Sequence, residues 1–334
     1  MKQKLIAIFI SLFFLMTLMY CGGSDNPKVD KKTPPPKAPT IPESVTINPI
    51  AFNGISWEDL TAFWQKMVKF DGGEYDVGTD DPNYPDRNPK HKVKIENFVL
   101  MNTPVTNNMF KIFIEDANGY NTKDFWSEEG WKWKNDNNIT CPIGWNDLNL
   151  KDEQSEDSLK PVINVSWYEA NALCKALTNK AKAKDDNDYV RLPTEFEWEV
   201  AANDGEGKAY PWGNDFKLEK LGDNEKGVDL PGSHLGTETQ KRLIDMIGNL
   251  HQWTNSEYKL YPGNKTGFKS PKLDRGFMVA RGTSFQYADH ARTVHYRLPI
   301  PKDTRDPRVG IRLVHGNYDV LKSMWQQEED KDIN

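Results

Sequence analysis

The chain has 334 residues, of which 37% are hydrophobic and 11% aromatic, so it can bury the core of one large domain or two ordinary ones. Its formal net charge is −6, and the body of the chain contains no long run of Lys and Arg. Because phosphate binding needs clustered basic residues, nucleic acid is not expected as a partner. Eleven tryptophans favour a fold whose irregular segments are held by large aromatic rings.

The first twenty residues have the composition of an export signal. A positively charged start, MKQK, precedes the uncharged stretch LIAIFISLFFLMTLMY at 5–20. A membrane-spanning helix needs about 20 apolar residues, so this length favours a signal peptide over 1–20. Cys21 follows directly, and LMYC resembles the lipobox of bacterial lipoproteins. The resemblance implies export and a lipid anchor on Cys21 in a bacterial membrane, on the periplasmic face or at the cell surface; an ordinary secreted protein and an uncleaved anchor are the alternatives.

A tether is predicted after the lipidated cysteine. Residues 22–47, GGSDNPKVDKKTPPPKAPTIPESVTI, are rich in Pro, Lys and Asp and poor in apolar residues, so they cannot bury a core. Together with Cys21 they form a flexible segment over 21–47. At about 3.1 Å per residue in the polyproline form, this segment spans roughly 80 Å. We expect one folded domain over 48–317, followed by a polar tail over 318–334.

The first elements of the domain are short. Residues 56–70 have a helical pattern, which Ser56 is placed to cap and in which apolar side chains fall on one face. Strands are expected at 72–78, between glycine turns, and at 91–102, where polar and apolar residues partly alternate. Thr106 is placed to cap the next helix.

Two later helices begin at capping boxes. In SWYE, Ser166 accepts a backbone N–H and Glu169 reaches back to the start of the helix. In TEFE, Thr194 and Glu197 occupy the same two positions. Both boxes predict a helix that begins at the following residue.

The rest of the domain is expected to be irregular. The glycine-rich stretch 205–240 predicts loops, and GIRLVHG at 310–316 predicts a strand. Long loops need aromatic packing or a bound metal to hold them. The two cysteines of the domain, Cys141 and Cys174, form one disulfide or none, because export permits disulfides but no CxxC motif is present.

Eight stretches, taken in order, resemble the formylglycine-generating enzyme family, also called the sulfatase-modifying factor domain. They cover about residues 71–316 and read GGEYDVGTDD, HKVKIENFVLMNTPVTNNMFKIFI, PVINVSWYEANALCKALT, RLPTEFEWEVAAN, YPWGN, DMIGNLHQW, RGTSF and VGIRLVHG. RLPTEFEWE followed by YPWG is the most specific part. The resemblance implies a single α+β domain, irregular and loop-rich, of C-type-lectin-like topology. We expect Arg191, Glu195, Glu197 and Trp198 to fix a helix against its loops.

The family's chemistry is a copper-dependent oxidation. The resemblance implies Cu(I) held by two cysteine thiolates, the soft ligands that this ion prefers, and conversion of a substrate cysteine to formylglycine. Both thiolates follow a turn that matches Gly282–Ser284. In this chain the two positions fall on Tyr287 and Arg292. We therefore expect no copper.

The same turn marks a candidate ligand-binding cleft. Ser284 matches a serine near the oxygen site, and His251 stands where the family usually has tryptophan. A different catalytic metal is not expected, because two histidines five residues apart, His290 and His295, share neither a helix face nor a strand face. The candidate residues of the cleft are His251, Ser284, Tyr287, His290, Arg292 and His295.

Structural calcium is implied by the match in DMIGNLHQW. The ligands would be the side chains of Asp245 and Gln252 and the carbonyls of Gly248 and Leu250. Calcium binds carboxylates, amide oxygens and backbone carbonyls together. Gln252 replaces the usual glutamate and removes a charge, which Asp245 restores. The alternative is a bare turn stabilised by hydrogen bonds.

The sequence thus favours an exported, lipid-anchored binding domain that recognises a peptide, protein or glycan and lacks the copper oxidase activity. One alternative is an enzyme of the family, either a formylglycine-generating oxidase or a divergent oxidoreductase that uses the same cleft. Another is a structural envelope protein. Ser284 has no base partner visible in the sequence, which disfavours an enzyme that uses it as a nucleophile.

Removal of the anchor cysteine tests the lipoprotein prediction. Cys21→Ala should move the protein from the detergent phase to the aqueous phase in a phase-partition experiment, because the lipid is attached at this residue. Cys141→Ala is the matched control and should stay with the detergent. If the processed Cys21→Ala protein still partitions with membrane, the lipoprotein prediction is wrong.

Overall fold

The computed structural model describes residues 67–152, 155–182, 189–220, 227–234, 237–286 and 293–316, all of which belong to the unit Ile47–Asn334. Several sequence predictions therefore lie outside the described residues. They are the signal peptide, Cys21 and the tether, most of the helix expected over 56–70, the tail 318–334, and the cleft candidates Tyr287, His290 and Arg292.

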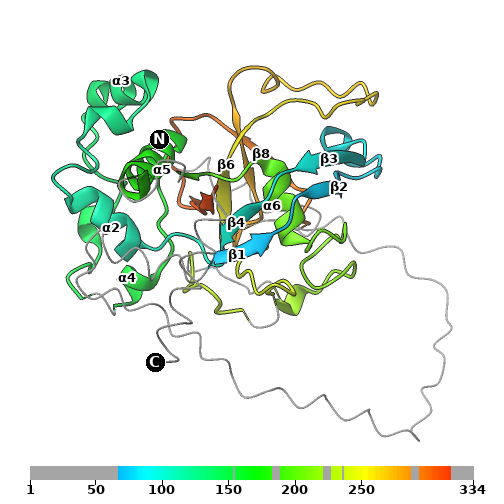
Figure 1. Cartoon of the computed structure of the whole chain (residues 1–334), viewed down its shortest axis with the longest axis horizontal. Helices are drawn as coiled ribbons and strands as arrows, with labels where there is room; N and C mark the ends of the chain where they lie inside the picture. Colours follow the sequence, from blue (N-terminus) through cyan, green and yellow to red (C-terminus); the bar gives the residue numbers. More distant parts are fainter. Residues whose placement is uncertain are drawn as a thin grey trace, which may run out of the picture. The chain divides into compact units, whose positions relative to one another are not determined.

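The described strands form three small sheets (Figure 1). The first has the order β1-β4-β10-β5, with β1 at Met67–Phe70, β4 at Phe98–Met101, β10 at Val314–His315 and β5 at Val190–Arg191. The second pairs β2 at Gly73–Val77 with β3 at His91–Ile95. The third has the order β8-β7-β6-β9, with β8 at Arg297–Ile300, β7 at Met278–Arg281, β6 at His251–Glu257 and β9 at Val309–Gly310. Among the described strands, only β6 and β9 pair in parallel.

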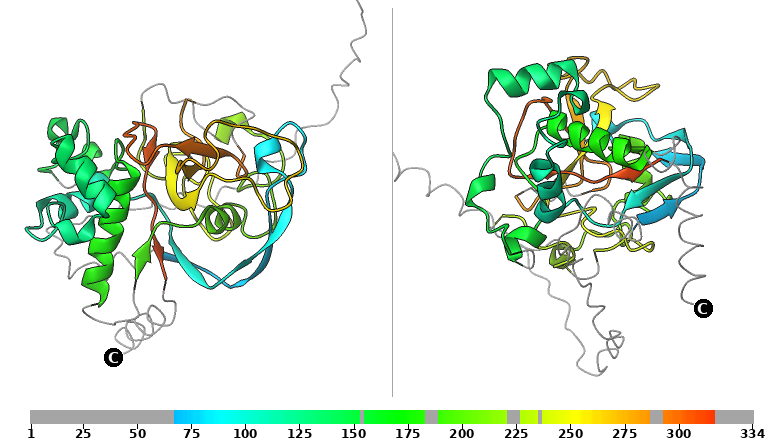
Figure 2. Two further views of the ribbon diagram at one scale, coloured as in Figure 1. Left: turned by 90° about the horizontal axis from the view of Figure 1, so that it is seen from above. Right: turned by 60° about the vertical axis from the view of Figure 1, so that its left-hand side comes forward.

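The helices divide into two groups. Four gather on one side of the domain, and the views in Figures 1 and 2 agree on this: α2 at Asn107–Glu115, α3 at Glu128–Asp136, α4 at Glu156–Leu159 and α5 at Trp167–Lys182. The short helix α6 at Glu195–Ala202 instead lies among the strands and contacts β2, β3, β6 and β7. Single 3-10 turns occur at Pro85–Arg87, Lys123–Phe125, Trp145–Asp147 and Leu218–Lys220. In the described part of the chain, no helix is both long and apolar enough to cross a membrane.

Both predicted capping boxes are confirmed. At the start of α5, Ser166 Oγ accepts the Glu169 N–H at 3.2 Å, and Glu169 Oε2 accepts the Ser166 N–H at 2.8 Å. At the start of α6, Thr194 Oγ1 accepts the Glu197 N–H at 3.1 Å, and Glu197 Oε2 accepts the Thr194 N–H at 2.7 Å. The predicted cap at Thr106 also forms, since its Oγ1 accepts the Met109 N–H. These signals could be found in the sequence because both partners lie within one turn.

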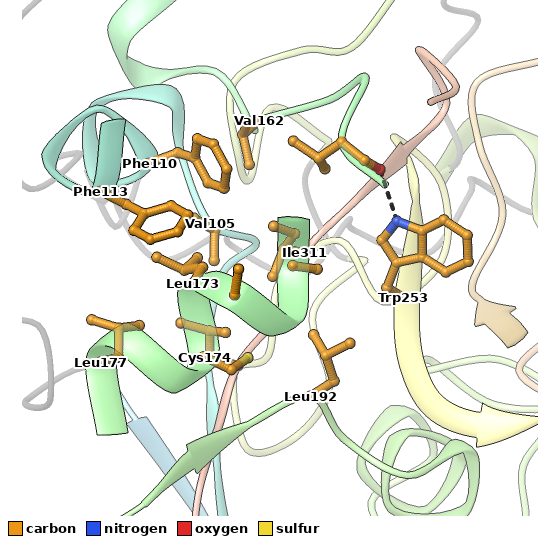
Figure 3. Close-up of a cluster of buried hydrophobic side chains, with 14 of the residues drawn as sticks. Val105, Phe110, Phe113, Val162, Leu173, Cys174, Leu177, Leu192, Trp253 and Ile311 are labelled. Atoms are coloured by element: carbon orange, nitrogen blue, oxygen red, sulfur yellow. Dashed lines mark hydrogen bonds between the residues drawn. The ribbon is translucent and has the colours of Figure 1, made fainter. Parts of the chain in front are cut away.

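A large hydrophobic cluster joins α2 and α5 to the strands (Figure 3). Its members include Val105, Phe110, Phe113, Val162, Leu173, Cys174, Leu177, Leu192, Trp253 and Ile311, all buried. Trp253 on β6 is fully buried, and its indole N–H donates to the Val165 carbonyl at 2.9 Å. Since Val165 directly precedes the Ser166 cap, the ring fixes the start of α5 against the third sheet.

The prediction of a helix over 56–70 is wrong at the C-terminal end of that range. Met67–Phe70 is strand β1, which pairs antiparallel with β4 in the register Met67↔Met101 and Phe70↔Phe98. Met67 and Phe70 are both buried, so their spacing of three imitates one face of a helix. The ladder to β4 satisfies the backbone of this segment, and a contact between distant residues of this kind overrides local periodicity.

Two strands predicted as continuous are divided. The strand expected at 91–102 is β3 and β4, which belong to different sheets and are separated by exposed Glu96 and Asn97. Asn97 Oδ1 accepts the Gly72 N–H at 2.6 Å at this crossing point. The strand expected at 310–316 likewise contributes to two sheets, as the end of β9 and as β10. The predicted loops of 205–240 are confirmed for the residues described, where the only helix is the turn Leu218–Lys220.

The Trp253 hydrogen bond yields a test of the core. Trp253→Phe should lower the free energy of unfolding by about 1–3 kcal/mol, because the buried Val165 carbonyl loses its donor. Trp212→Phe is the matched control: its indole N–H donates to the Asp215 carbonyl at 3.0 Å in an exposed position, where water replaces the lost donor. Chemical denaturation measures both losses. Equal losses would contradict the assigned role of Trp253.

Candidate functional site

The candidate site is built around the turn Gly282–Ser284. Strand β7 ends at Arg281, β6 begins at His251, and the two pair antiparallel with Gln252 opposite Arg281. Gly282 has φ = 80°, and a Cβ added there would lie 2.9 Å from the Met246 carbonyl oxygen. Only glycine fits both the left-handed backbone and this close approach.

His251 is fixed beside this turn. Its ring is fully buried, and Nδ1 lies 2.9 Å from the Gly282 carbonyl oxygen. Burial lowers the pKa of His251 to about 4, so the imidazole is neutral at pH 7. A neutral ring beside a carbonyl carries its hydrogen on Nδ1 and donates it there. His251 thus links the start of β6 to the turn through a hydrogen bond.

A buried charge cluster holds Arg281, the residue directly before the turn. Glu199 on α6 is fully buried, and its Oε1 accepts the Gly78 N–H at 2.7 Å and binds His295 Nδ1 at 2.8 Å. Its Oε2 pairs with the guanidinium of Arg281, which is also fully buried. Burial alone would raise the pKa of Glu199, but Arg281, His295 and the Gly78 N–H outweigh it and lower the pKa to about 2.

A second ion pair lies one helical turn away. Arg297 on β8 donates to Glu195 through Nε at 2.7 Å and Nη2 at 2.8 Å, a bidentate geometry. Its guanidinium also lies over the rings of Tyr258 and Tyr261, with 4.9 Å and 4.2 Å to their centroids. Arg281 Nη1 approaches Glu195 to 3.7 Å, so the two pairs form one network.

Sequence reasoning found only part of this network. The motif predicts that Glu195 holds the helix, whereas the sequence does not predict Glu199 or the cations Arg281 and Arg297. The available signal was the spacing of Glu195 and Glu199, which are four residues apart in a predicted helix and therefore share one face. Two carboxylates on the buried face of a helix require cations from elsewhere in the chain.

The structure places three of the six cleft candidates. Ser284 is 2% exposed, and its Oγ accepts the Gln286 N–H at 3.4 Å. His295 binds Glu199, and His251 binds the turn itself. Among the described residues, the Ser284 hydroxyl contacts the Gln286 backbone and no histidine or carboxylate.

The cysteines of the domain do not fit a copper centre. Cys174 lies on α5 in the hydrophobic cluster, 3% exposed, and burial raises the pKa of its thiol to about 12. It is therefore not the thiolate that Cu(I) requires at neutral pH. Cys141 is half-buried, and both cysteines are free, so the alternative without a disulfide holds. Among the residues that the structure describes, no group of three or more His, Cys, Asp and Glu side chains is placed to hold a metal ion.

The loop predicted to bind calcium is sharply curved. Asp245, Gly248 and Asn249 have φ values of 56°, 88° and 61°, in the left-handed region. Asp245 is 2% exposed; its Oδ2 accepts the Asn249 side-chain amide at 2.9 Å and its Oδ1 accepts the Gly232 N–H at 3.3 Å. Burial raises the pKa of Asp245, and these donors oppose that rise.

Gln252, the other predicted side-chain ligand, is fully engaged by the protein. Its Oε1 accepts the Trp198 indole N–H at 2.8 Å and Arg312 Nε at 2.7 Å. Its Nε2 donates to the backbone carbonyl of Asp245 at 2.6 Å. The Gly248 carbonyl accepts the Leu250 N–H at 2.8 Å. These contacts do not fit calcium at the four predicted ligands, because the only acceptor atom of the Gln252 side chain faces away from the loop.

The chain matches the model of a known family. The model of the sulfatase-modifying factor enzyme 1-like domain matches residues 57–317, most of the chain. The chain belongs to this family. The assignment drawn from the motifs RLPTEFEWE, YPWG and RGTSF is thereby confirmed.

Curated relatives include both inactive and active proteins. The chain is 28% identical over 296 residues to the inactive C-alpha-formylglycine-generating enzyme 2 of Bos taurus, which covers 75% of this chain and 88% of that protein. It is 27% identical to the hercynine oxygenase of Mycolicibacterium smegmatis, over 65% of this chain and 53% of that protein. It is 25% identical to the formylglycine-generating enzyme of Bos taurus, over 68% and 70%. The chain spans about half the length of the hercynine oxygenase.

Solved structures show the same fold at low identity. Treponema denticola variable protein 1 has a TM-score of 0.53 and 19% identity, and covers 75% of this chain and 95% of its own. PvdO from Pseudomonas aeruginosa has a TM-score of 0.53 and 17% identity, with 75% and 94% covered. The α+β, loop-rich fold implied by the resemblance is confirmed.

Glu199 provides a test of the charge cluster. Glu199→Gln should destabilise the protein by roughly 3–5 kcal/mol at pH 7, because it removes the nearer counter-charge of buried Arg281, which must then share Glu195 with Arg297. Glu206→Gln, which breaks the exposed pair with Lys208, is the matched control and should change stability little.

The pH dependence of Glu199→Gln has a defined sign. A carboxylate with a lowered pKa stabilises the folded state above its ordinary pKa of 4.5 and loses that effect as the pH falls through about 2. The difference in unfolding free energy between wild type and Glu199→Gln should therefore shrink between pH 4.5 and pH 2, as measured by denaturation at each pH. A difference that stays constant over this range would contradict an ionised Glu199.

Proposed function

We propose that this protein is an exported, lipid-anchored member of the sulfatase-modifying factor family that binds a peptide, protein or glycan at the cell envelope and does not oxidise cysteine. The apolar leader, Cys21 and the Pro- and Lys-rich tether support the location. A long tether holds a domain away from the membrane surface, where it meets ligands rather than lipid.

The placement of the cysteines carries this proposal. The family oxidase needs two thiolates next to the Gly282–Ser284 turn, and both positions carry other residues in this chain. Cys174 cannot reach the turn, because it lies on α5 and is packed in the hydrophobic cluster. Without a soft ligand pair, Cu(I) has no site of the expected kind.

The contacts of His251 and His295, the two cleft histidines that the structure describes, point the same way. His251 uses Nδ1 to hold the turn, and His295 uses Nδ1 to compensate buried Glu199. Both rings therefore have structural partners within the fold. A domain that keeps the scaffold of an enzyme but uses its polar groups for packing is suited to binding.

The runner-up is an oxidoreductase of different chemistry. The similarity to hercynine oxygenases favours it; His251 contacts Gly282 of the turn, and the His295 carbonyl accepts from Arg281, the residue before the turn. A structural envelope protein is the third possibility. Two experiments test the formylglycine-generating activity and ligand binding.

The chemical experiment uses the purified full-length chain with copper, oxygen, a reductant and a C-x-P-x-R peptide, read by mass spectrometry. We expect no aldehyde above the metal-only control, while the formylglycine-generating enzyme of Bos taurus serves as the positive control. Aldehyde formation that is lost in Cys141→Ala or Cys174→Ala would falsify the non-oxidase proposal and place the enzyme first.

The binding experiment presents the labelled full-length chain to a peptide library and to a glycan array. Saturable binding to members of one class, competed by the same unlabelled ligand, supports the proposal. Failure to bind either class would favour the structural alternative.

A further inference from the structure

We infer that the loop 245–252 of this chain is held by the amide of Gln252 in place of a calcium ion, so that the domain folds without calcium. The proposal goes beyond ligand binding, since it concerns what stabilises the loop that supports the turn at Gly282. It rests on the donors and acceptors that surround one buried side chain.

The oxygen side of Gln252 is fixed by two donors. Gln252 is fully buried on β6, and its Oε1 accepts from Trp198 Nε1 at 2.8 Å and from Arg312 Nε at 2.7 Å. Indole and guanidinium groups can only donate. A flipped amide would set Nε2 against both of them and leave two buried N–H groups without an acceptor, which is costly. The oxygen must therefore face Trp198 and Arg312.

The nitrogen side of Gln252 consequently faces the loop. Nε2 donates to the Asp245 carbonyl at 2.6 Å and links the first residue of the loop to the strand that follows it. A calcium ligand at this place has to present an oxygen. An amide N–H instead presents positive partial charge, which satisfies the carbonyl and opposes a cation.

The charge around the loop is also balanced within the protein. Asp245 is the only carboxylate among the four predicted ligands, and its two oxygens accept from Asn249 and Gly232. Arg312 is fully buried, and a guanidinium is not deprotonated in proteins, so it is a fixed cation next to Gln252. A divalent ion in the loop would add positive charge beside a guanidinium that cannot move into water.

Glutamate at position 252 would reverse this arrangement. A carboxylate has two acceptor oxygens, so one can accept from Trp198 and Arg312 while the other faces the loop carbonyls. One substitution, Gln252→Glu, should therefore convert a loop that is indifferent to calcium into one that needs it. The wild type and Gln252→Glu differ at one atom, which is Nε2 in glutamine and Oε2 in glutamate, and the predicted difference in calcium response depends on that atom.

The test measures thermal unfolding of the full-length chain in calcium and in chelator, together with calcium titration by calorimetry. We expect the wild-type melting temperature to be the same in both conditions and its titration to be flat. Gln252→Glu should melt on the order of 5 °C higher in saturating calcium than in chelator, because calcium binds its folded state alone. Gln286→Glu, which adds the same charge at an exposed position, is the matched control and should show no calcium effect.

The wild-type arm keeps the test decisive even if Gln252→Glu does not fold. Wild-type protein that binds calcium and melts higher in it, with both effects lost in Asp245→Ala, would overturn the proposal and restore the calcium site. A folded Gln252→Glu protein with no calcium response would also overturn it, because the amide would then not be what excludes the ion.

Discussion

The rest of the domain depends on the interactions of one buried group, the carboxylate of Glu199. It receives a backbone N–H from Gly78 after β2, the guanidinium of Arg281 from β7, and the ring of His295 before β8. A charge buried in this way is tolerated only when every lone pair has a partner. Glu199 therefore fixes three distant segments at one point and determines where the turn after Arg281 lies.

The scaffold and the chemistry of the family are separable in this chain. Gly282 keeps the turn because its backbone angle and the Met246 carbonyl exclude a side chain, whatever the turn is used for. His251 and His295 take part in the same support through Nδ1. The residues that form the site thus act through packing and charge balance. The fold therefore persists although the two thiolate positions carry tyrosine and arginine.

What could be predicted from the sequence follows from the distance between partners. The caps of α5 and α6 join residues three apart, and both were predicted correctly. The local pattern predicts the end of a helix where strand β1 lies, because the partners of β1 on β4 are distant in the chain: Phe70 pairs with Phe98, 28 residues later, and Met67 with Met101, 34 residues later. The partners of Glu199 lie 82 and 96 residues away, and no local pattern identifies them. The sequence shows that Gln252 replaces the usual glutamate. The donors Trp198 and Arg312, which are distant in the chain, determine which atom of its amide faces the loop.

Trp198 joins the two networks into one structure. Its indole N–H donates to Gln252, its ring lies 5.6 Å from the Arg281 guanidinium, and a Cβ on Gly282 would lie 3.2 Å from its edge. Thr283 Oγ1 in turn accepts the Gly248 N–H at 3.1 Å, so the loop and the turn touch directly. Among the described residues, the turn and the loop are thus held by donors and acceptors of the chain itself. If the amide of Gln252 replaces calcium as proposed, a change in calcium concentration leaves the turn in place, in contrast to a loop whose shape depends on a bound ion.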